Sequence, residues 1–167
     1  KFGLILAAVA MCAFTACSQE SAQSKAGEKG AQPEAAAPQA SSKSLVVYYS
    51  QTGATKKLAE IFQKAKNADV FEIATVTPYP STYDSTIAAV GAQRESKQWP
   101  ALVNAKADLA KYDTVYLGYP IMFGSFAPPI YTFLDSNELS GKVVVPFCTY
   151  GSGGRKASAE ELKTLDP

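Results

Sequence analysis

From Ser44 onward the chain alternates between two hydrophobic patterns, and this alternation is the strongest restriction on its fold. Short apolar runs rich in β-branched and aromatic residues predict buried strands at 45–49, 70–73, 114–118 and 143–147. Helical spacing follows each of them: an apolar face at Leu58, Ile61, Phe62 and Ala65, then helices at 83–96, from Pro128 onward, and at 156–165. The alternation predicts an α/β fold, a parallel sheet covered on both faces, with ligands bound at the carboxyl ends of the strands.

Three loops follow strands at that end of the predicted sheet. The first consists of Ser50, Gln51, Thr52, Gly53, Ala54 and Thr55. Its hydroxyls and glycine, next to the free N–H groups and positive dipole end of a helix, have the composition of a phosphate site. The spacing is that of neither a GxxxxGK[ST] loop nor a GxGxxG loop. Simple helix capping by Thr52 or Thr55 is the alternative.

The other two loops add flat and apolar surface. The loop after the third predicted strand contains Gly118, Tyr119, Pro120, Ile121, Met122, Phe123 and Gly124, and the loop after the fourth contains Thr149, Tyr150, Gly151, Ser152, Gly153 and Gly154. Ordinary core packing is the alternative role of Met122 and Phe123. Together the three loops suit a ligand with one phosphate and one large flat ring.

The chain contains no histidine, which excludes several kinds of site. Ser-His-Asp and Cys-His nucleophiles, HExxH zinc sites and histidine-ligated haem all require an imidazole. The acidic residues form no recognisable catalytic pair, so no catalytic residue and no metal site is predicted. With 16 Lys and Arg against 15 Asp and Glu, the net charge of +1 gives no support for a nucleic-acid partner.

The N-terminal segment differs from the rest of the chain. Lys1 is followed by an apolar run over 2–16, which fits an export signal better than a membrane span. The sequence FTAC, which ends at Cys17, resembles a bacterial lipoprotein signal, in which a lipid is attached to the cysteine. An ordinary secretory signal or a buried helix is the alternative.

Residues 18–43 contain no aromatic or β-branched residue, so we expect a disordered tether there. The predicted organisation is therefore a signal peptide at 1–17, a tether at 18–43 and a folded domain at 44–167. A lipid on Cys17 predicts an exported lipoprotein anchored to a bacterial membrane, on the periplasmic or the cell-surface side.

The three loops, in this order after the first, third and fourth strands, resemble those of the flavodoxin family. More narrowly, the sequence is similar to flavodoxin-like lipoproteins of bacteria, which the TPYP sequence at 77–80 followed by Tyr83 and Asp84 also fits. The resemblance covers 44–167 and implies a doubly wound sheet of order 2-1-3-4-5 with FMN as cofactor. It further implies that residues 50–55 hold the phosphate, that 120–124 line one face and edge of the flavin, and that 149–153 close the other side. Only four strands are counted, so we expect the natural chain to supply a fifth strand beyond Pro167.

Three functions are compatible with this pattern. We favour a membrane-tethered FMN electron carrier with a redox protein as partner. The second is an FMN-dependent reductase of quinones or nitro compounds that takes hydride from NAD(P)H, and whether the protein is an enzyme in this sense is left open. Only Arg155 and Lys156 stand near the loops to bind nucleotide phosphates, and no second substrate pocket is evident. The third is a flavin-free binding module on the same fold.

Overall fold

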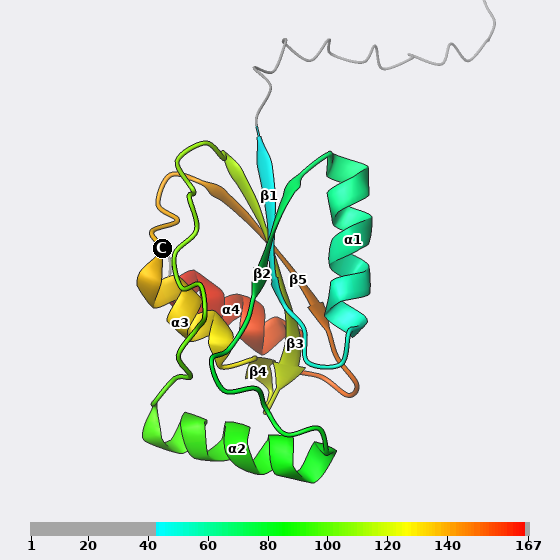
Figure 1. Cartoon of the computed structure of the whole chain (residues 1–167), viewed down its shortest axis with the longest axis vertical. Helices are drawn as coiled ribbons and strands as arrows, with labels where there is room; N and C mark the ends of the chain where they lie inside the picture. The colour runs from blue at the N-terminus through cyan, green and yellow to red at the C-terminus, as the bar shows by residue number, and fades with distance from the viewer. Residues whose placement is uncertain (1–42, 166–167) are drawn as a thin grey trace, which may run out of the picture. The chain divides into compact units, whose positions relative to one another are not determined.

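The computed structural model describes residues 43–165 (Figure 1). The predicted signal peptide at 1–17, Cys17 and all of the predicted tether except Lys43 lie outside the described residues. The elements are β1 (Ser44–Tyr49), α1 (Ala54–Lys66), β2 (Asp69–Ile73), α2 (Tyr83–Ser96), β3 (Thr114–Met122), β4 (Ser125–Phe126), α3 (Pro129–Ser136), β5 (Val143–Thr149) and α4 (Arg155–Leu165). Within 43–165 no helix combines the length and the apolar character needed to cross a membrane.

The main sheet is parallel, with the strands in the order β2-β1-β3-β5. In the middle of the sheet, Val47 of β1 pairs with Phe71 of β2 on one side and with Leu117 of β3 on the other. The short strand β4 pairs antiparallel with the end of β3. The predicted α/β fold with a parallel sheet is confirmed. If the four parallel strands alone are numbered along the chain, β5 is the fourth, and their order in the sheet is 2-1-3-4.

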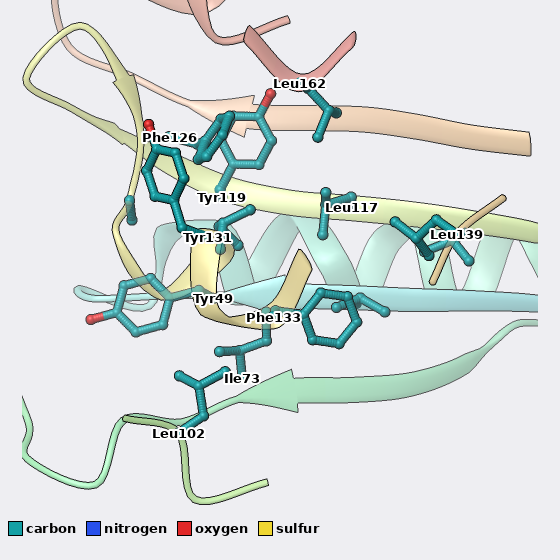
Figure 2. Close-up of a cluster of buried hydrophobic side chains, with 14 of the residues drawn as sticks. Tyr49, Ile73, Leu102, Leu117, Tyr119, Phe126, Tyr131, Phe133, Leu139 and Leu162 are labelled. Atoms are coloured by element: carbon teal, nitrogen blue, oxygen red, sulfur yellow. The ribbon is translucent and has the colours of Figure 1, made fainter. Parts of the chain in front are cut away.

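Side chains of the central strands point alternately to the two faces of the sheet, as the period of a strand requires. On one face, Val47 and Leu117 belong to a core that includes Phe133 of α3 and Leu162 of α4 (Figure 2). On the other face, the side chains of Val46 and Tyr48 pack with those of α1. Helices therefore cover both faces, which makes the sheet doubly wound.

The prediction of the apolar face of α1 is only partly correct. Ile61 is 62% exposed, whereas Thr55 and Ala59 are buried. The small side chains of Thr55 and Ala59 allow the helix backbone to approach the sheet closely, which turns Ile61 toward solvent. The prediction is correct for Phe62, whose ring stacks on that of Phe147 with centroids 4.5 Å apart.

The loop predicted after Gly118 is largely strand. β3 continues to Met122, and the chain then turns at once into β4. The strand is extended because Tyr119 and Phe126 are both buried and pack edge to face, with ring centroids 5.5 Å apart. The prediction of a loop from Gly118 through Phe126 is therefore wrong for 119–122, which continue β3, and for 125–126, which form β4. It is correct only for the tight turn at 123–124.

Helix α2 lies across the carboxyl ends of the strands, below the sheet in Figure 1, and does not cover either face of the sheet. Its buried side chains are those of Thr86 and Val90. A helix with so little buried apolar surface gains little from packing on a sheet. Its position brings it to the end of the sheet where ligands bind in open α/β folds.

Candidate functional site

A cavity of about 940 Å³ lies at the carboxyl ends of β1, β3 and β5. Its wall is built from the three predicted loops and from the region of α2. The lining residues are Gln51, Thr52, Ser81, Tyr83, Thr86, Ile87, Pro120, Ile121, Met122, Phe123, Gly124, Gly151, Ser152, Gly153 and Gly154. The prediction that the three loops meet at one end of the sheet is thus confirmed.

The first loop leads into α1 through Gly53, which has a left-handed φ of 86°. The hydroxyl of Ser50 accepts a hydrogen bond from the backbone N–H of Lys56 at 3.2 Å. Ser50 therefore occupies the capping role that the sequence offered to Thr52 or Thr55. Thr52 lines the cavity, and no acidic residue in the first turn of α1 offsets the positive end of the helix dipole.

Thr55, by contrast, is a buried residue of the domain interior. Its hydroxyl oxygen lies 2.8 Å from that of Thr149, which is half-buried at the end of β5. Neither residue lines the cavity, and neither do Ser50, Gly53, Ala54 or Tyr150. The predicted site residues therefore divide into those that form the cavity wall and those that hold the wall in place.

A two-residue turn between β3 and β4 forms the second part of the wall. Both of its residues have positive φ angles, 53° at Phe123 and 78° at Gly124, as a type I′ hairpin turn requires. A left-handed phenylalanine is rare and costs about 1 to 2 kcal/mol. Phe123 stays 54% exposed at the cavity, while the preceding Met122 is buried. The turn thus directs an aromatic ring outward along the cavity wall.

The third loop lies directly on this turn. Gly154 has a φ of 88°, and a Cβ atom there would approach Ile121 Cγ2 to 2.6 Å and the carbonyl oxygen of Gly124 to 2.7 Å. Only a glycine allows these two backbones to lie so close. Gly151 and Gly153 have open space around them and line the cavity with backbone.

The fourth part of the wall was not predicted. Tyr83, Thr86 and Ile87 reach the cavity from the first turns of α2, and Ser81 reaches it from just before the helix. Tyr83 belongs to the sequence at 77–84 that fits the family resemblance, but none of these four residues was predicted to belong to the site. The other signal is the weak apolar pattern of 83–96, which leaves this helix without a face to pack on the sheet.

Polar contacts fasten α2 and β4 to the domain. Arg94 of α2 donates to the carbonyl oxygen of Phe126 at 2.7 Å and to the hydroxyl of Tyr131 at 3.3 Å. The hydroxyls of Tyr131 and Ser125 both donate to the carboxylate of Glu161 on α4. Burial, and then the hydrogen bond to Glu161, raises the pKa of Tyr131, so its hydroxyl remains a neutral donor at physiological pH.

No lining residue of the cavity carries a formal charge at neutral pH. The nearby Cys148 is also neutral, because burial raises the pKa of its thiol more than Arg155 lowers it. Among residues 43–165 no group of three His, Cys, Asp or Glu side chains could hold a metal ion. The cavity therefore offers hydroxyls, backbone amides, a helix dipole and apolar surface.

Comparison with known proteins identifies relatives of this domain. A protein from Bacteroides eggerthii DSM 20697 assigned as a flavoprotein is 35% identical, with a TM-score of 0.68 over 74% of this chain and 80% of the other. A flavoprotein from Lactobacillus acidophilus NCFM, solved in complex with FMN, is 27% identical, with a TM-score of 0.68 over 74% and 85% of the two chains.

A relative at the level of sequence is NAD(P)H dehydrogenase (quinone) 3 of Rhizobium meliloti (strain 1021), which is 30% identical over 126 residues. The alignment covers 70% of this chain and 58% of that protein, so the chain spans about three fifths of the length of the curated relatives it matches. The family model described as Flavodoxin matches residues 43–167, a range that includes all three loops. The chain therefore belongs to the flavodoxin family.

Proposed function

We propose that this domain binds FMN in the cavity at the carboxyl ends of β1, β3 and β5. The observation that carries the proposal is that Thr52, two residues before α1, lines the same cavity as the apolar wall at Met122 and Phe123. FMN has one phosphate and one large flat ring, and the FMN complex of the similar Lactobacillus flavoprotein supports the assignment. Bound FMN would supply reversible one- and two-electron chemistry.

The residues present fit such a cofactor. Thr52 and the first N–H groups of α1 would hold the phosphate, since a helix N-terminus without an acidic residue attracts an anion. The wall at 120–124 would line one side and edge of the ring, and the backbone at 151–153 would close the other side. Ser50, Thr55 and Thr149 would position these groups from outside the cavity.

We further propose that the protein is an electron carrier that exchanges electrons with a redox protein. Electron transfer through a flavin needs no side-chain base, and the cavity wall offers none. It also offers no basic side chain for the phosphates of a nicotinamide dinucleotide. The exposed rings of Phe123 and Tyr150 suit the small, transient docking surface that redox partners use.

The decisive experiment is purification of the full chain, followed by an absorbance spectrum and mass analysis of the released cofactor. A yellow protein that releases FMN in a one-to-one ratio is the expected result. A colourless chain that does not bind added FMN would contradict the proposal and favour a flavin-free binding module.

An NAD(P)H-dependent reductase is the second candidate, and the observation that favours it is the quinone dehydrogenase name of the Rhizobium relative. Anaerobic mixing of the FMN-loaded chain with NADH or NADPH separates the two candidates. The flavin of a carrier should bleach slowly, because the cavity wall has no cationic side chain to bind the phosphates of the nucleotide. Rapid bleaching followed by many quinone turnovers would establish the reductase instead.

We also propose that a lipid on Cys17 anchors the exported protein to a bacterial membrane. The support is the apolar run that ends in FTAC and the polar segment behind it. Fractionation of cells that produce the Cys17→Ser chain tests this. The variant should leave the membrane fraction, and its recovery there at the wild-type level would contradict the proposal.

A further inference from the structure

Cationic side chains lie beside the cavity without lining it. Two helices begin where loops of the cavity wall end: α1 carries the exposed Lys56 and Lys57 in its first turns, and α4 begins with the exposed Arg155 and Lys156. The ammonium group of Lys56 is paired with the carboxylate of Glu72 at 3.1 Å. Among residues 43–165 the other three cations form no ion pair, so their charges are available to a partner.

The starts of these two helices are neighbours in space. The hydroxyl oxygens of Thr55 and Thr149 are 2.8 Å apart, so the first turn of α1 lies next to the end of β5 (Figure 1). The loop after β5 leads into α4, and the buried Ser158 fixes the first turn of that helix. Its backbone N–H donates to the carbonyl oxygen of Gly154 at 2.8 Å, and its hydroxyl donates to that of Arg155 at 2.9 Å. The cations of both helices therefore belong to one surface.

The stability of the helices does not explain these cations. The N-terminus of a helix is the positive end of its dipole, where a carboxylate is favourable and a cation is unfavourable. Neither α1 nor α4 has an acidic residue in its first turn. In contrast, α2 on the other side of the cavity has Asp84 in its first turn. Side chains and helix dipoles thus both make the β5 side of the cavity positive, and this potential attracts an anionic partner.

An exposed aromatic ring lies on the same surface. Tyr150 directly follows β5 and is 50% exposed. The loop that carries it packs against the hairpin turn of the cavity, because a Cβ atom on Gly154 would lie 2.7 Å from the carbonyl oxygen of Gly124. Protein interfaces are enriched in tyrosine and arginine, with polar residues around them. A ring beside three unpaired cations at the edge of the cavity has this composition.

We propose that Lys57, Tyr150, Arg155 and Lys156, here named the basic rim, dock an acidic redox protein. The proposal rests on the proposed binding of FMN and adds the charge of the partner. In each encounter the reduced cofactor loses one electron, the acceptor gains one, and any proton released passes to solvent. Opposite charges guide such encounters and raise the association rate more than the final affinity. A small, weak contact is sufficient, since electron-transfer complexes are among the smallest protein interfaces.

The first test compares two soluble haem proteins of opposite charge. The full chain, saturated with FMN and reduced anaerobically with one equivalent of dithionite, is mixed in a stopped-flow instrument with the acidic soluble domain of cytochrome b5 or with basic cytochrome c. Each ferric haem takes up one electron and becomes ferrous. Between about 20 and about 300 mM salt, the rate constant for cytochrome b5 should fall at least tenfold, whereas that for cytochrome c should rise or stay constant. A rate constant for cytochrome b5 that does not fall with salt would overturn the proposal.

A rim variant locates the docking surface. The chain with Lys57→Gln, Arg155→Gln and Lys156→Gln should reduce cytochrome b5 at least tenfold more slowly than the wild type at low salt, and most of the salt dependence should be lost. Tyr150→Ala should slow the reaction at least threefold and leave its salt dependence unchanged, because the ring carries no charge. Saturation with FMN keeps differences in FMN affinity out of both comparisons.

The matched control removes the same number of charges from the opposite ends of the same two helices. It combines Lys64→Gln and Lys66→Gln in the last turn of α1 with Lys163→Gln in the last turn of α4, and all three lysines are exposed. This control should change the rate constant for cytochrome b5 less than twofold. Equal slowing in the rim variant and in the control would attribute the effect to net charge and would overturn the basic rim.

Three outcomes separate docking from FMN binding and from nucleotide binding. One-to-one uptake of FMN with the same rate constant for cytochrome b5 in the rim variant and the wild type would overturn the docking surface alone. A wild-type chain that takes up no FMN would overturn both proposals. Rapid bleaching by NADH that the rim variant loses, while its rate with cytochrome b5 is kept, would assign these cations to the phosphates of the nucleotide and overturn docking.

Discussion

The hydroxyl oxygens of Thr55 and Thr149 lie 2.8 Å apart and join the first turn of α1 to the end of β5. Thr55 is buried and Thr149 is half-buried, so this hydrogen bond is largely shielded from water. It links two loops of the candidate site from behind the cavity wall. Replacing Thr55 by Val keeps the shape of the side chain and removes its hydroxyl. This substitution therefore tests the role of the hydrogen bond in stability separately from any role in ligand binding.

Thr55→Val should change mainly the stability of the domain, and Thr52→Val should change mainly its affinity for FMN. Thr55→Val should lower the free energy of unfolding by about 1 kcal/mol, because Thr149 loses its partner, with little change in FMN affinity. Thr52→Val should leave stability within about 0.5 kcal/mol. It should weaken FMN binding about tenfold, since a hydrogen bond to a charged group contributes about 1.5 to 3 kcal/mol. Urea denaturation and flavin fluorescence titration measure the two effects. A larger loss of FMN affinity in the Thr55 variant would contradict this division.

Gly118→Ala should destabilise the domain strongly. A Cβ atom at this position would lie 2.2 Å from Cζ of Phe147, in the core between α1 and the sheet. Because the ring stacks on Phe62, it has little freedom to move, and overpacking of this kind costs about 1 to 3 kcal/mol. Gly151→Ala is the matched control, since nothing lies within 4 Å of its added Cβ. Equal midpoints of urea unfolding for the two variants would show that the core adapts.

Arg94→Gln should loosen α2 from the rest of the domain. The carbonyl oxygen of Phe126 is buried and loses the donor that lies 2.7 Å away, which costs about 1 to 3 kcal/mol. Hydrogen exchange should report faster exchange of the α2 amides than of the β1 and β3 amides. Glu95→Gln, an exposed change on the same helix, should leave exchange as in the wild type. Uniform acceleration throughout the domain would instead indicate global destabilisation.

Stability should fall in alkaline solution above about pH 10. Burial raises the pKa of Tyr79 from 10.0 to about 12, against smaller opposing effects of Gln93 and Arg94, and burial also raises the pKa of Tyr49. The folded domain thus favours neutral phenols, and the unfolded chain releases these protons first as the pH rises. The stabilisation is complete below pH 10 and is lost as the pH approaches 12.

Tyr79→Phe removes one of these ionisable groups. Urea midpoints measured between neutral pH and the alkaline range should therefore decline less steeply in this variant than in the wild type. Tyr83→Phe is the control, because Tyr83 is exposed. An equal decline in the Tyr79 variant and the wild type would assign the alkaline loss of stability to other groups.

The parallel sheet could be predicted because its strands are short apolar runs and each is followed by a polar loop. The three loops could be placed together for the same reason, since parallel strands end at one edge. The end of β3 could not be predicted, because the burial of Tyr119 and Phe126 depends on a tertiary contact between their rings. The roles of Ser50, Thr52 and Thr55 could not be separated either, because a hydroxyl in a loop can bond to the helix, to a ligand or to the interior.

The residues of α2 were beyond prediction for a different reason. The helix that carries Tyr83, Thr86 and Ile87 is attached by Arg94 to β4 and by Gly91 to the hairpin turn. Nothing in the local sequence encodes these distant contacts. A helix pattern without a clear apolar face was the one usable indication that this segment does not cover the sheet.

The position of α2 also allows the ligand selectivity of the cavity to change during evolution without a change in the stability of the core. The core packs around β1 and β3, whereas Tyr83 and Ile87 lie outside both clusters of buried side chains. Substitutions at these two positions can therefore reshape the cavity while the sheet and its covering helices keep their contacts. A lineage could exchange one small-molecule partner for another through mutations in a single peripheral helix, without first acquiring compensating mutations in the core.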